Sequence, residues 1–443
     1  VNMNVFKNML YKEFLISKNI NKYKLAEIFF LIAILFLCSS LALAVFFMIP
    51  SLIFGTILQL RKKNYFKNPW QFSFFICGIL ILLNALLQRF ILPNAYEEIW
   101  DPNLSIIGTA NWIPFFWIFW ACQPFLDTEK KRKRFSLVLV CGSFPLLLTG
   151  FGQYFFNWNG PFETLNGLIV WYQRPHNGNL TGLFNNQNYT GSWLNLVLPF
   201  CITLVFEKSK NLINRSFSIF FLIAISSSII LTNSRNALVG LLLVLPLWIG
   251  KEGIIFIIFG SFLLFFSLSP IFSGEWQSNL LNLIPNFFIK QFDPSGYAGL
   301  ESTRLDLITS ALTIIKTSPF FGVGAASFTP IYQLETNLYR GHSHNLFTEL
   351  TLSYGVPVTL IFIVSIISLL IISYKKIFFN KNRFKTINFI DRSYWVSVFF
   401  FFISQLSDIQ YFEGRISLLI WILLASLKNI IEENKSEQKE YSK

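Results

Sequence analysis

The chain has 443 residues, of which 53% are hydrophobic and 13% charged. Soluble domains carry about 25% charged residues, so this composition excludes a set of ordinary water-soluble domains. The net charge of +13 arises from cations in short clusters between apolar runs, a pattern typical of membrane topology and not of nucleic-acid binding. We therefore expect the lipid bilayer as a partner and no nucleic acid.

Apolar runs of about 15 to 25 residues recur along the chain, and this length crosses the hydrocarbon core as a helix. The stretch 25–60 is long enough for two short spans, with a break expected near Pro50 or slightly before. Further spans are expected near 72–90, 109–127, 135–155, 189–206, 216–232, 236–250, 253–271, 346–373, 393–410 and 416–430. The predicted fold class is an all-α polytopic membrane protein of about twelve transmembrane helices. We expect a single domain over 1–443.

The distribution of Lys and Arg gives the expected orientation of these spans. With both termini in the cytoplasm, 28 of the 36 cationic residues lie inside and 8 outside, which is a strong positive-inside bias. Two outer segments are long: 156–188, rich in turn formers and amides, and 272–344, the largest loop, which precedes the span 346–373. The polar chemistry of the chain is therefore expected on the face away from the cytoplasm.

The large outer loop contains an expected amphipathic helix over 302–317. Ser302 or Thr303 can cap its start, and Ser318 with Pro319 ends it. We expect this helix to lie along the membrane mouth. Its apolar stripe is expected to contain Leu305, Ile308, Leu312 and Ile315.

Arginines on the outer face are candidates for binding an anion. Arg235 lies in a tight turn, 232–236, between two apolar runs, and its planar guanidinium suits phosphate oxygens. Arg304 in the first turn of the expected helix strengthens the preference of a helix N-terminus for an anion. The alternatives are a snorkelling Arg235 and, for Arg304, an ion pair with Glu301 or Asp306.

Arg174 and Arg340 are weaker candidates, because each lies in a polar loop. All the histidines lie in external segments, namely His176, His342 and His344. His344 is expected at the outer mouth of the bundle, where an imidazole can act as a general base near neutral pH. Metal binding by His342 and His344 is a competing interpretation, but the sequence offers no suitably spaced third ligand, so no metal is expected. A structural role for His344 is the remaining alternative.

Several short motifs in this order form a recognisable set. They are Gly182 to Tyr189, Ser234-Arg235, Ser302 to Arg304, Phe321 to Gly324 with Ser327-Phe328, and His344-Asn345 followed nine residues on by Gly355. Over residues 150–415 the chain resembles the O-antigen ligase and polymerase superfamily of bacterial membrane glycosyltransferases. The resemblance implies a GT-C-like membrane fold in the bacterial inner membrane.

The resemblance also implies an inverting, metal-independent transfer without a cofactor. A glycan would pass from a polyprenyl-diphosphate-linked donor to a hydroxyl of a glycan or lipid-linked acceptor at the periplasmic face, as in lipopolysaccharide or other surface polysaccharide biosynthesis. Arg235 and Arg304 would stabilise the leaving diphosphate, and His344 would deprotonate the hydroxyl. The residues expected to bind the substrates are Arg174, Arg340, His342, Asn345 and Asn188.

Two alternatives remain open at the level of sequence. Val356-Pro357 follows Gly355 where ligases often continue with Gly and Thr, so ligase and polymerase stay undecided, as does transfer to a protein hydroxyl. The other alternative is a transporter of a small anion such as bicarbonate. The sequence offers no charged residue near the middle of a span for a coupling ion and no obvious internal repeat, which weighs against transport.

Overall fold

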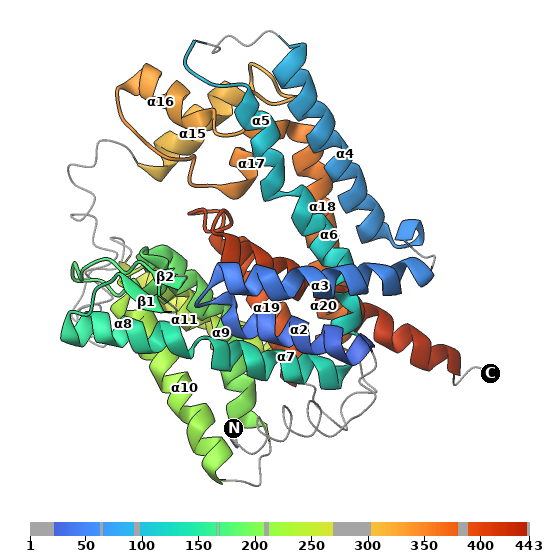
Figure 1. Cartoon of the computed structure of the whole chain (residues 1–443). Coiled ribbons are helices and arrows are strands. Elements are labelled where there is room, and N and C mark those ends of the chain that lie inside the picture. The colour runs from blue at the N-terminus through green and yellow to red at the C-terminus, as the bar shows by residue number, and fades with distance from the viewer. Residues whose placement is uncertain are drawn as a thin grey trace.

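The computed structural model describes residues 22–62, 65–92, 98–164, 166–167, 169–207, 212–268, 303–379 and 389–440. Helices dominate these residues, as Figure 1 shows. The α-helices are α2 (Lys22–Leu37), α3 (Leu41–Arg61), α4 (Pro69–Phe90), α5 (Asn103–Gly108), α6 (Ile113–Ala121), α7 (Glu129–Gly142), α8 (Phe144–Phe156), α9 (Gln187–Phe206), α10 (Leu212–Leu231), α11 (Arg235–Ile249), α12 (Lys251–Leu268), α15 (Arg304–Ile315), α16 (Phe328–Thr336), α17 (Leu346–Tyr354), α18 (Val356–Phe378), α19 (Phe389–Ser404) and α20 (Gly414–Glu440). The 3₁₀ helices are η1 (Tyr65–Lys67), η2 (Thr109–Asn111), η3 (Gln123–Phe125) and η4 (Gly182–Phe184).

Seven helical segments among the described residues are long and apolar enough to cross a membrane. They are Leu41–Arg61, Pro69–Phe90, Asn103–Ala121, Glu129–Phe156, Gln187–Phe206, Val356–Phe378 and Gly414–Glu433. Shorter apolar helices occur at Arg215–Leu231 and Arg235–Ile249. The structure is consistent with an all-α membrane protein, and the count of about twelve spans stays a prediction.

The first predicted break is wrong in its position. Helices α2 and α3 are separated at residues 38–40, and Pro50 lies inside α3. Ser40 caps α3, because its side chain accepts a hydrogen bond from the backbone N–H of Leu43 at 3.4 Å. A proline within a membrane helix is tolerated where neighbouring groups satisfy the freed carbonyl. The two helices lie side by side as a hairpin (Figure 1).

The predicted span 346–373 is also interrupted, because Gly355 separates α17 from α18. Gly355 has a φ of 90°, and a Cβ at this position would lie 2.1 Å from the carbonyl oxygen of Phe320. Only glycine fits this combination of backbone conformation and close approach. Pro357 then occupies the first turn of α18, where its missing N–H needs no partner.

The described part of the large loop predicted to lie outside, residues 303–344, forms a small unit with α17. Figure 1 shows α15, α16 and α17 together at one end of the molecule. The predicted cap is confirmed: Thr303 and Asp306 form a capping box at the start of α15. Residues 272–302 of the predicted loop lie outside the described residues.

Part of the predicted apolar stripe of this helix is exposed on the surface of the protein. Leu305 and Leu312 are 75% and 48% exposed. The buried side chains are Leu307, Ala311, Ile314 and Ile315. Through these side chains α15 packs on α16 and α17, in a cluster with Phe328, Tyr332 and Leu352 among its members. Its position along the membrane mouth stays a prediction.

Helices α4 and α5 hold this unit in place through a buried amide. Gln88 donates to the carbonyl oxygens of Phe321 and Ser353 at 2.6 and 2.9 Å. Its own oxygen accepts from the hydroxyl of Ser105 at 2.7 Å. Since an unpaired buried amide is costly, these bonds fix the position of the outer unit relative to α4.

The centre of the helical assembly is formed by α9, α19 and α20. In the apolar window of the Gly414–Glu433 segment, 89% of the residues are buried inside the protein. Lipid tails are as apolar as Leu, so such burial stabilises mainly through close packing and hydrogen bonds. A buried charge also needs a partner in this setting, and Arg132 of α7 pairs with Asp391 of α19 at 2.9 Å.

The outer segment 156–188 contains a feature that the sequence did not predict. Strands β1 (Phe162–Thr164) and β2 (Ile169–Trp171) pair antiparallel, with Glu163 opposite Val170. The chain then continues through η4 into α9. The hairpin brings the loop that follows it beside the end of α8, where Gln153 donates to the carbonyl oxygen of Arg174 at 2.8 Å.

Candidate functional site

His344 lies in the loop that leads into α17, and the surrounding side chains fix its backbone. Asn345 caps α17, because its side chain accepts from two backbone N–H groups of the first turn at 2.9 and 3.1 Å. Ser343 is buried and donates its backbone N–H and its hydroxyl to Glu349 at 3.0 and 2.9 Å. His344 itself has a φ of 56°. This left-handed conformation costs a non-glycine residue about 1 to 3 kcal/mol, so the bonds around it maintain it.

The loop between α19 and α20 meets the start of α17. The backbone N–H of Leu346 donates to the carbonyl oxygen of Gln405 at 3.0 Å, and the Asn345 amide donates to that of Leu406 at 3.1 Å. The Gln405 side chain also accepts from the backbone N–H groups of Gln410 and Tyr411 at 2.9 and 3.1 Å. The loop is thus rigidly folded and tied to the residue next to His344.

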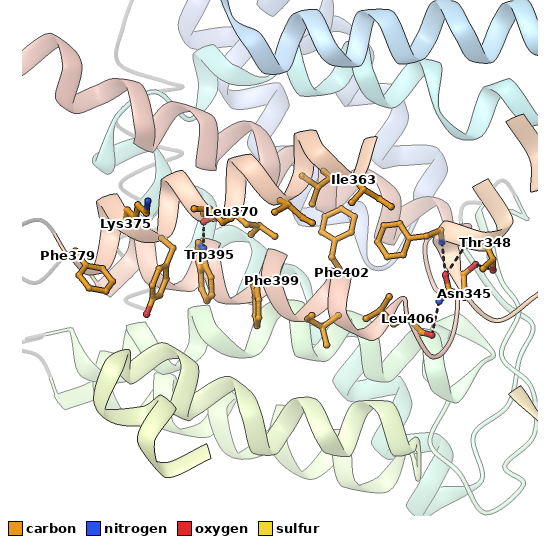
Figure 2. Close-up of a pocket in the computed structure, with 16 residues that line it drawn as sticks. Asn345, Thr348, Ile363, Leu370, Lys375, Phe379, Trp395, Phe399, Phe402 and Leu406 are labelled. Carbon is orange, nitrogen blue, oxygen red and sulfur yellow. Dashed lines mark hydrogen bonds between the residues drawn. The ribbon is translucent and has the colours of Figure 1, made fainter. Parts of the chain in front are cut away.

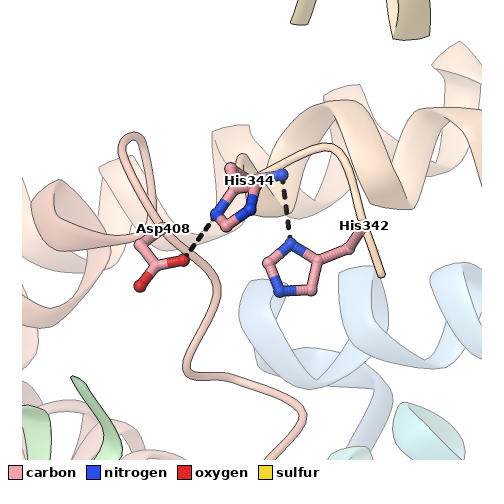
Figure 3. Close-up of side chains that lie close together, drawn as sticks. All are labelled: His342, His344 and Asp408. Atoms are coloured by element: carbon pink, nitrogen blue, oxygen red, sulfur yellow. Dashed lines mark hydrogen bonds and ion pairs between the residues drawn. The ribbon is translucent and has the colours of Figure 1, made fainter. Parts of the chain in front are cut away.

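This loop brings Asp408 to His344, as Figure 3 shows. His344 Nδ1 lies 2.8 Å from Asp408 Oδ1. The Asp408 side chain is 6% exposed and that of His344 28% exposed. The predicted span 393–410 is therefore too long, because α19 ends at Ser404 and Asp408 lies in the following loop.

Charge and burial set the protonation of Asp408. Burial raises the pKa of Asp408, but the hydrogen bond and charge of His344, with the charge of Arg304, outweigh it and lower the pKa. An ionised carboxylate only accepts hydrogen bonds, so His344 Nδ1 carries the proton. When the ring is neutral, this tautomer leaves the lone pair of His344 Nε2 to receive a proton from another molecule.

His342 lies beside the pair and is neutral near pH 7. Its Nδ1 accepts a hydrogen bond from the backbone N–H of His344 at 3.2 Å. The centroids of the two imidazole rings are 4.3 Å apart. Burial and the charge of His344 lower the pKa of His342 to about 4. Arg304 also contributes to this lowering, so its charge acts on the His344 site from the first turn of α15.

Asn188 connects the pair to the turn that contains Arg235. The Asn188 amide donates to Asp408 Oδ2 at 2.9 Å, and its oxygen accepts from the Ser234 hydroxyl at 2.8 Å. Ser234 caps α11, and Arg235 is the first residue of this helix. Gln410 donates to the same Asp408 oxygen at 3.0 Å. The starts of α9, α11 and α17 therefore meet around one carboxylate.

The predicted site residues thus fall into two groups. His344, His342, Asn345, Asn188 and the Ser234-Arg235 turn are joined by hydrogen bonds, and Arg304 is joined to them by charge.

Arg174 belongs to the second group. The Arg174 backbone donates to Asn185 at 2.8 Å, its side chain is exposed, and no contact in the described part of the chain joins it to the pair. Arg340 lies two residues before His342 and donates to the carbonyl oxygen of Tyr339 at 3.1 Å.

Asp408 is the principal residue that the sequence reasoning missed. Its signal was a carboxylate inside a predicted apolar span, and such residues are usually functional. Glu349, which fixes Ser343, carried the same signal within the predicted span 346–373.

The structure also supplies the third potential metal ligand that the sequence lacked. One ligand atom from each of His342, His344 and Asp408 lies within 4.8 Å of the others. The expectation that these histidines have no third partner is therefore wrong. In the geometry observed, His344 Nδ1 and Asp408 Oδ1 face each other at hydrogen-bonding distance, which is the arrangement of an oriented general base.

An apolar groove begins at this site and runs along α18 and α19 (Figure 2). It has a volume of about 980 Å³. Asn345 and Thr348 line the end near His344, and Lys375 and Phe379 line the opposite end (Figure 2). From Ile363 to Phe379 the groove follows α18 for about 24 Å at 1.5 Å per residue. This distance covers most of a hydrocarbon core of about 30 Å.

The fold and the site define an all-α membrane protein with a His–Asp pair at the end of an apolar groove. Residues 219–363, about a third of the chain, match the O-antigen ligase family. Within this segment, the match confirms the resemblance to the O-antigen ligase and polymerase superfamily. The matched segment contains Arg235, Arg304, His342 and His344, and it ends before Asp408. No match was found among curated proteins.

Proposed function

We propose that the protein transfers a glycan from a polyprenyl-diphosphate-linked donor to an acceptor hydroxyl at the periplasmic face of the bacterial inner membrane. The match to the O-antigen ligase family supports the class of reaction. The observation that carries the mechanism is the 2.8 Å contact between His344 Nδ1 and Asp408 Oδ1. This contact leaves His344 Nε2 free to act as a general base.

The proposed step is a single displacement. The acceptor oxygen attacks the anomeric carbon and gives its proton to His344 Nε2, while the bond from the anomeric carbon to the diphosphate oxygen breaks. Attack opposite the leaving group inverts the anomeric configuration. The departing diphosphate gains negative charge, which Arg235 at the start of α11 and Arg304 at the start of α15 would stabilise together with the two helix N-termini.

The groove supports a lipid-linked donor. Its end near His344 is bordered by Asn345, Phe347 and Leu406, so an isoprenoid chain in the groove would hold its diphosphate beside the base. Such positioning can supply a large part of a rate enhancement, because it replaces an encounter in solution by a held geometry.

The roles of the remaining predicted residues follow from their contacts. Asn188 and Asn345 bond the protein itself, so we propose that they position Asp408 and His344 in addition to bordering the substrates. His342, Arg340 and Arg174 remain proposed substrate-binding residues. The reaction is proposed to need no metal, because Asp408 already orients His344.

The test uses purified protein in vesicles with a polyprenyl-diphosphate glycan and a hydroxyl acceptor. His344→Ala should reduce transfer by about a hundred- to ten-thousand-fold, the usual contribution of a general base, while donor binding persists. Arg235→Lys should also lose most transfer, since it keeps the charge and loses the bidentate fork. The matched control is His176→Ala, because the His176 ring packs on Tyr154, away from the pair.

Equal activity of His344→Ala and wild type would remove this mechanism. Transfer that is abolished by EDTA and restored by zinc would replace it with a metal-dependent one. Unimpaired movement of bicarbonate across the vesicle membrane by the wild type, without glycan transfer, would favour an anion transporter.

A further inference from the structure

The end of the groove opposite His344 has a different chemistry from the site. This end is lined by Tyr374, Lys375, Phe379 and Trp395. Figure 2 labels Lys375, Phe379 and Trp395 there. The indole N–H of Trp395 donates to the carbonyl oxygen of Leu370 at 2.9 Å, so this ring presents its apolar surface to the groove. The end is thus apolar inside with a cation at its edge.

A second cation reaches the same end from another part of the fold. Lys251, at the start of α12, places its Nζ 3.9 Å from the centroid of the Phe379 ring. The turn before it packs on α18, because a Cβ on Gly250 would lie 3.1 Å from Phe378. Lys251 and Lys375 therefore stand at one opening, although they come from different helices.

These two lysines differ from the other cations nearby. Arg392 donates to the carbonyl oxygens of Trp248 and Ile249 at 3.2 and 2.7 Å, so its guanidinium is already bonded within the protein. Within the described ranges, neither Lys251 nor Lys375 forms an ion pair. Within the part of the chain that the structure describes, no carboxylate therefore neutralises the charges of Lys251 and Lys375 at this opening.

We propose that this end of the groove binds an anionic glycerophospholipid from the leaflet opposite the His344 site. Its phosphate lies between Lys251 and Lys375, and one acyl chain enters the groove past Tyr374 and Trp395. Charge complementarity selects this occupant, because basic pockets between membrane helices favour anionic headgroups. The aromatic rings at the opening suit the interfacial level of a bilayer. The acyl chain occupies only the end of the groove opposite His344, whereas the isoprenoid chain of the proposed donor occupies the end near His344.

The test is lipid binding to the purified full chain by native mass spectrometry, with phosphatidylglycerol and phosphatidylcholine of identical acyl chains. Wild type should retain phosphatidylglycerol in preference to phosphatidylcholine. Lys375→Ala and Lys251→Ala should each weaken phosphatidylglycerol binding by about fivefold, as expected for one lysine near a phosphate. Lys130→Ala, an exposed lysine of α7, is the charge-matched control and should bind like wild type.

A second variant tests the groove without changing charge. Ile371 lines it, and Ile371→Trp should fill it and lower retention of both phospholipids. Equal retention of the two lipids by wild type would overturn the proposal, as would lysine variants that bind like Lys130→Ala. Displacement of phosphatidylglycerol by polyprenyl phosphate would also overturn it, since the whole groove would then belong to a polyprenyl chain.

Discussion

Replacing Asp408 by Asn tests the central pair with almost no change in shape. The carboxylate accepts from four donors: His344 and the backbone N–H of Ile409 on one oxygen, and Asn188 and Gln410 on the other. An amide has one oxygen and one NH₂ group. In Asp408→Asn, two of these four donors therefore face the NH₂ group and lose their acceptor. If the NH₂ group faces His344, Nδ1 has to accept and Nε2 carries the proton, which removes the base.

The expected loss of transfer follows from the change in the tautomer of His344. In the serine-protease triad the corresponding Asp to Asn change lowers turnover by about ten-thousand-fold for this reason. A general base contributes roughly a hundred- to ten-thousand-fold, or about 3 to 5 kcal/mol at 1.36 kcal/mol per tenfold. If the amide turns the other way, Asn188 loses its acceptor on Asp408. Its contact with Ser234, next to Arg235, is then disturbed. Both orientations therefore lower transfer.

The assay is glycan transfer in vesicles, with donor binding and melting temperature measured on the same samples. We expect Asp408→Asn to bind the donor and fold, and to transfer at about a hundredth of the wild-type rate or less. Asp127→Asn is the matched control, because Asp127 forms only a partly exposed pair with Lys131. Transfer by Asp408→Asn within a few fold of wild type would refute the reasoning that Asp408 sets the tautomer of His344.

Three further predictions follow from other observations. Because the pKa of His342 is lowered to about 4, the unfolded chain binds a proton between about pH 6.5 and 4 that the folded chain does not. Stability should therefore fall as pH drops through this window, and the lowered pKa of Asp408 adds a loss only below about pH 4. His342→Gln should flatten the fall in melting temperature between pH 7.5 and 5, and an unchanged slope would contradict this. Gly355→Ala should destabilise the fold by about 1 to 3 kcal/mol in thermal unfolding, whereas Gly260→Ala, with open space around it, should not, and equal melting temperatures would show that Gly355 is not constrained. Reporter fusions at Lys131 and Ser295 should report opposite sides of the membrane, and the same side for both would exclude the predicted topology.

The sequence predicted an all-α membrane protein, because the length of an apolar run is a local signal. It could not locate where helices break. Pro50 is the strongest helix breaker in 25–60, yet the chain turns at residues 38–40, where Ser40 provides a cap. Gly355 was recognised only as part of a motif. Its effect on helix continuity depends on the approach of Phe320, which is a tertiary contact.

The candidate site shows the same division between local and tertiary information. His344 and Arg235 stood out, since a polar residue beside an apolar run is visible in one window of sequence. Their relationship was not visible, because Asn188 and Asp408 connect them from segments 46 residues before Ser234 and 64 residues after His344.

The family match has a similar limit, because it ends at residue 363 and contains neither Asn188 nor Asp408. The matched segment contains the proposed base and cations, whereas the carboxylate proposed to orient the base comes from a loop beyond it. Because that loop is bonded to the start of α17 through Gln405 and Leu406, its folding and the left-handed backbone of His344 depend on each other. The proposed functional unit is therefore larger than the matched segment, and changes in the α19–α20 loop should affect transfer as directly as changes around His344.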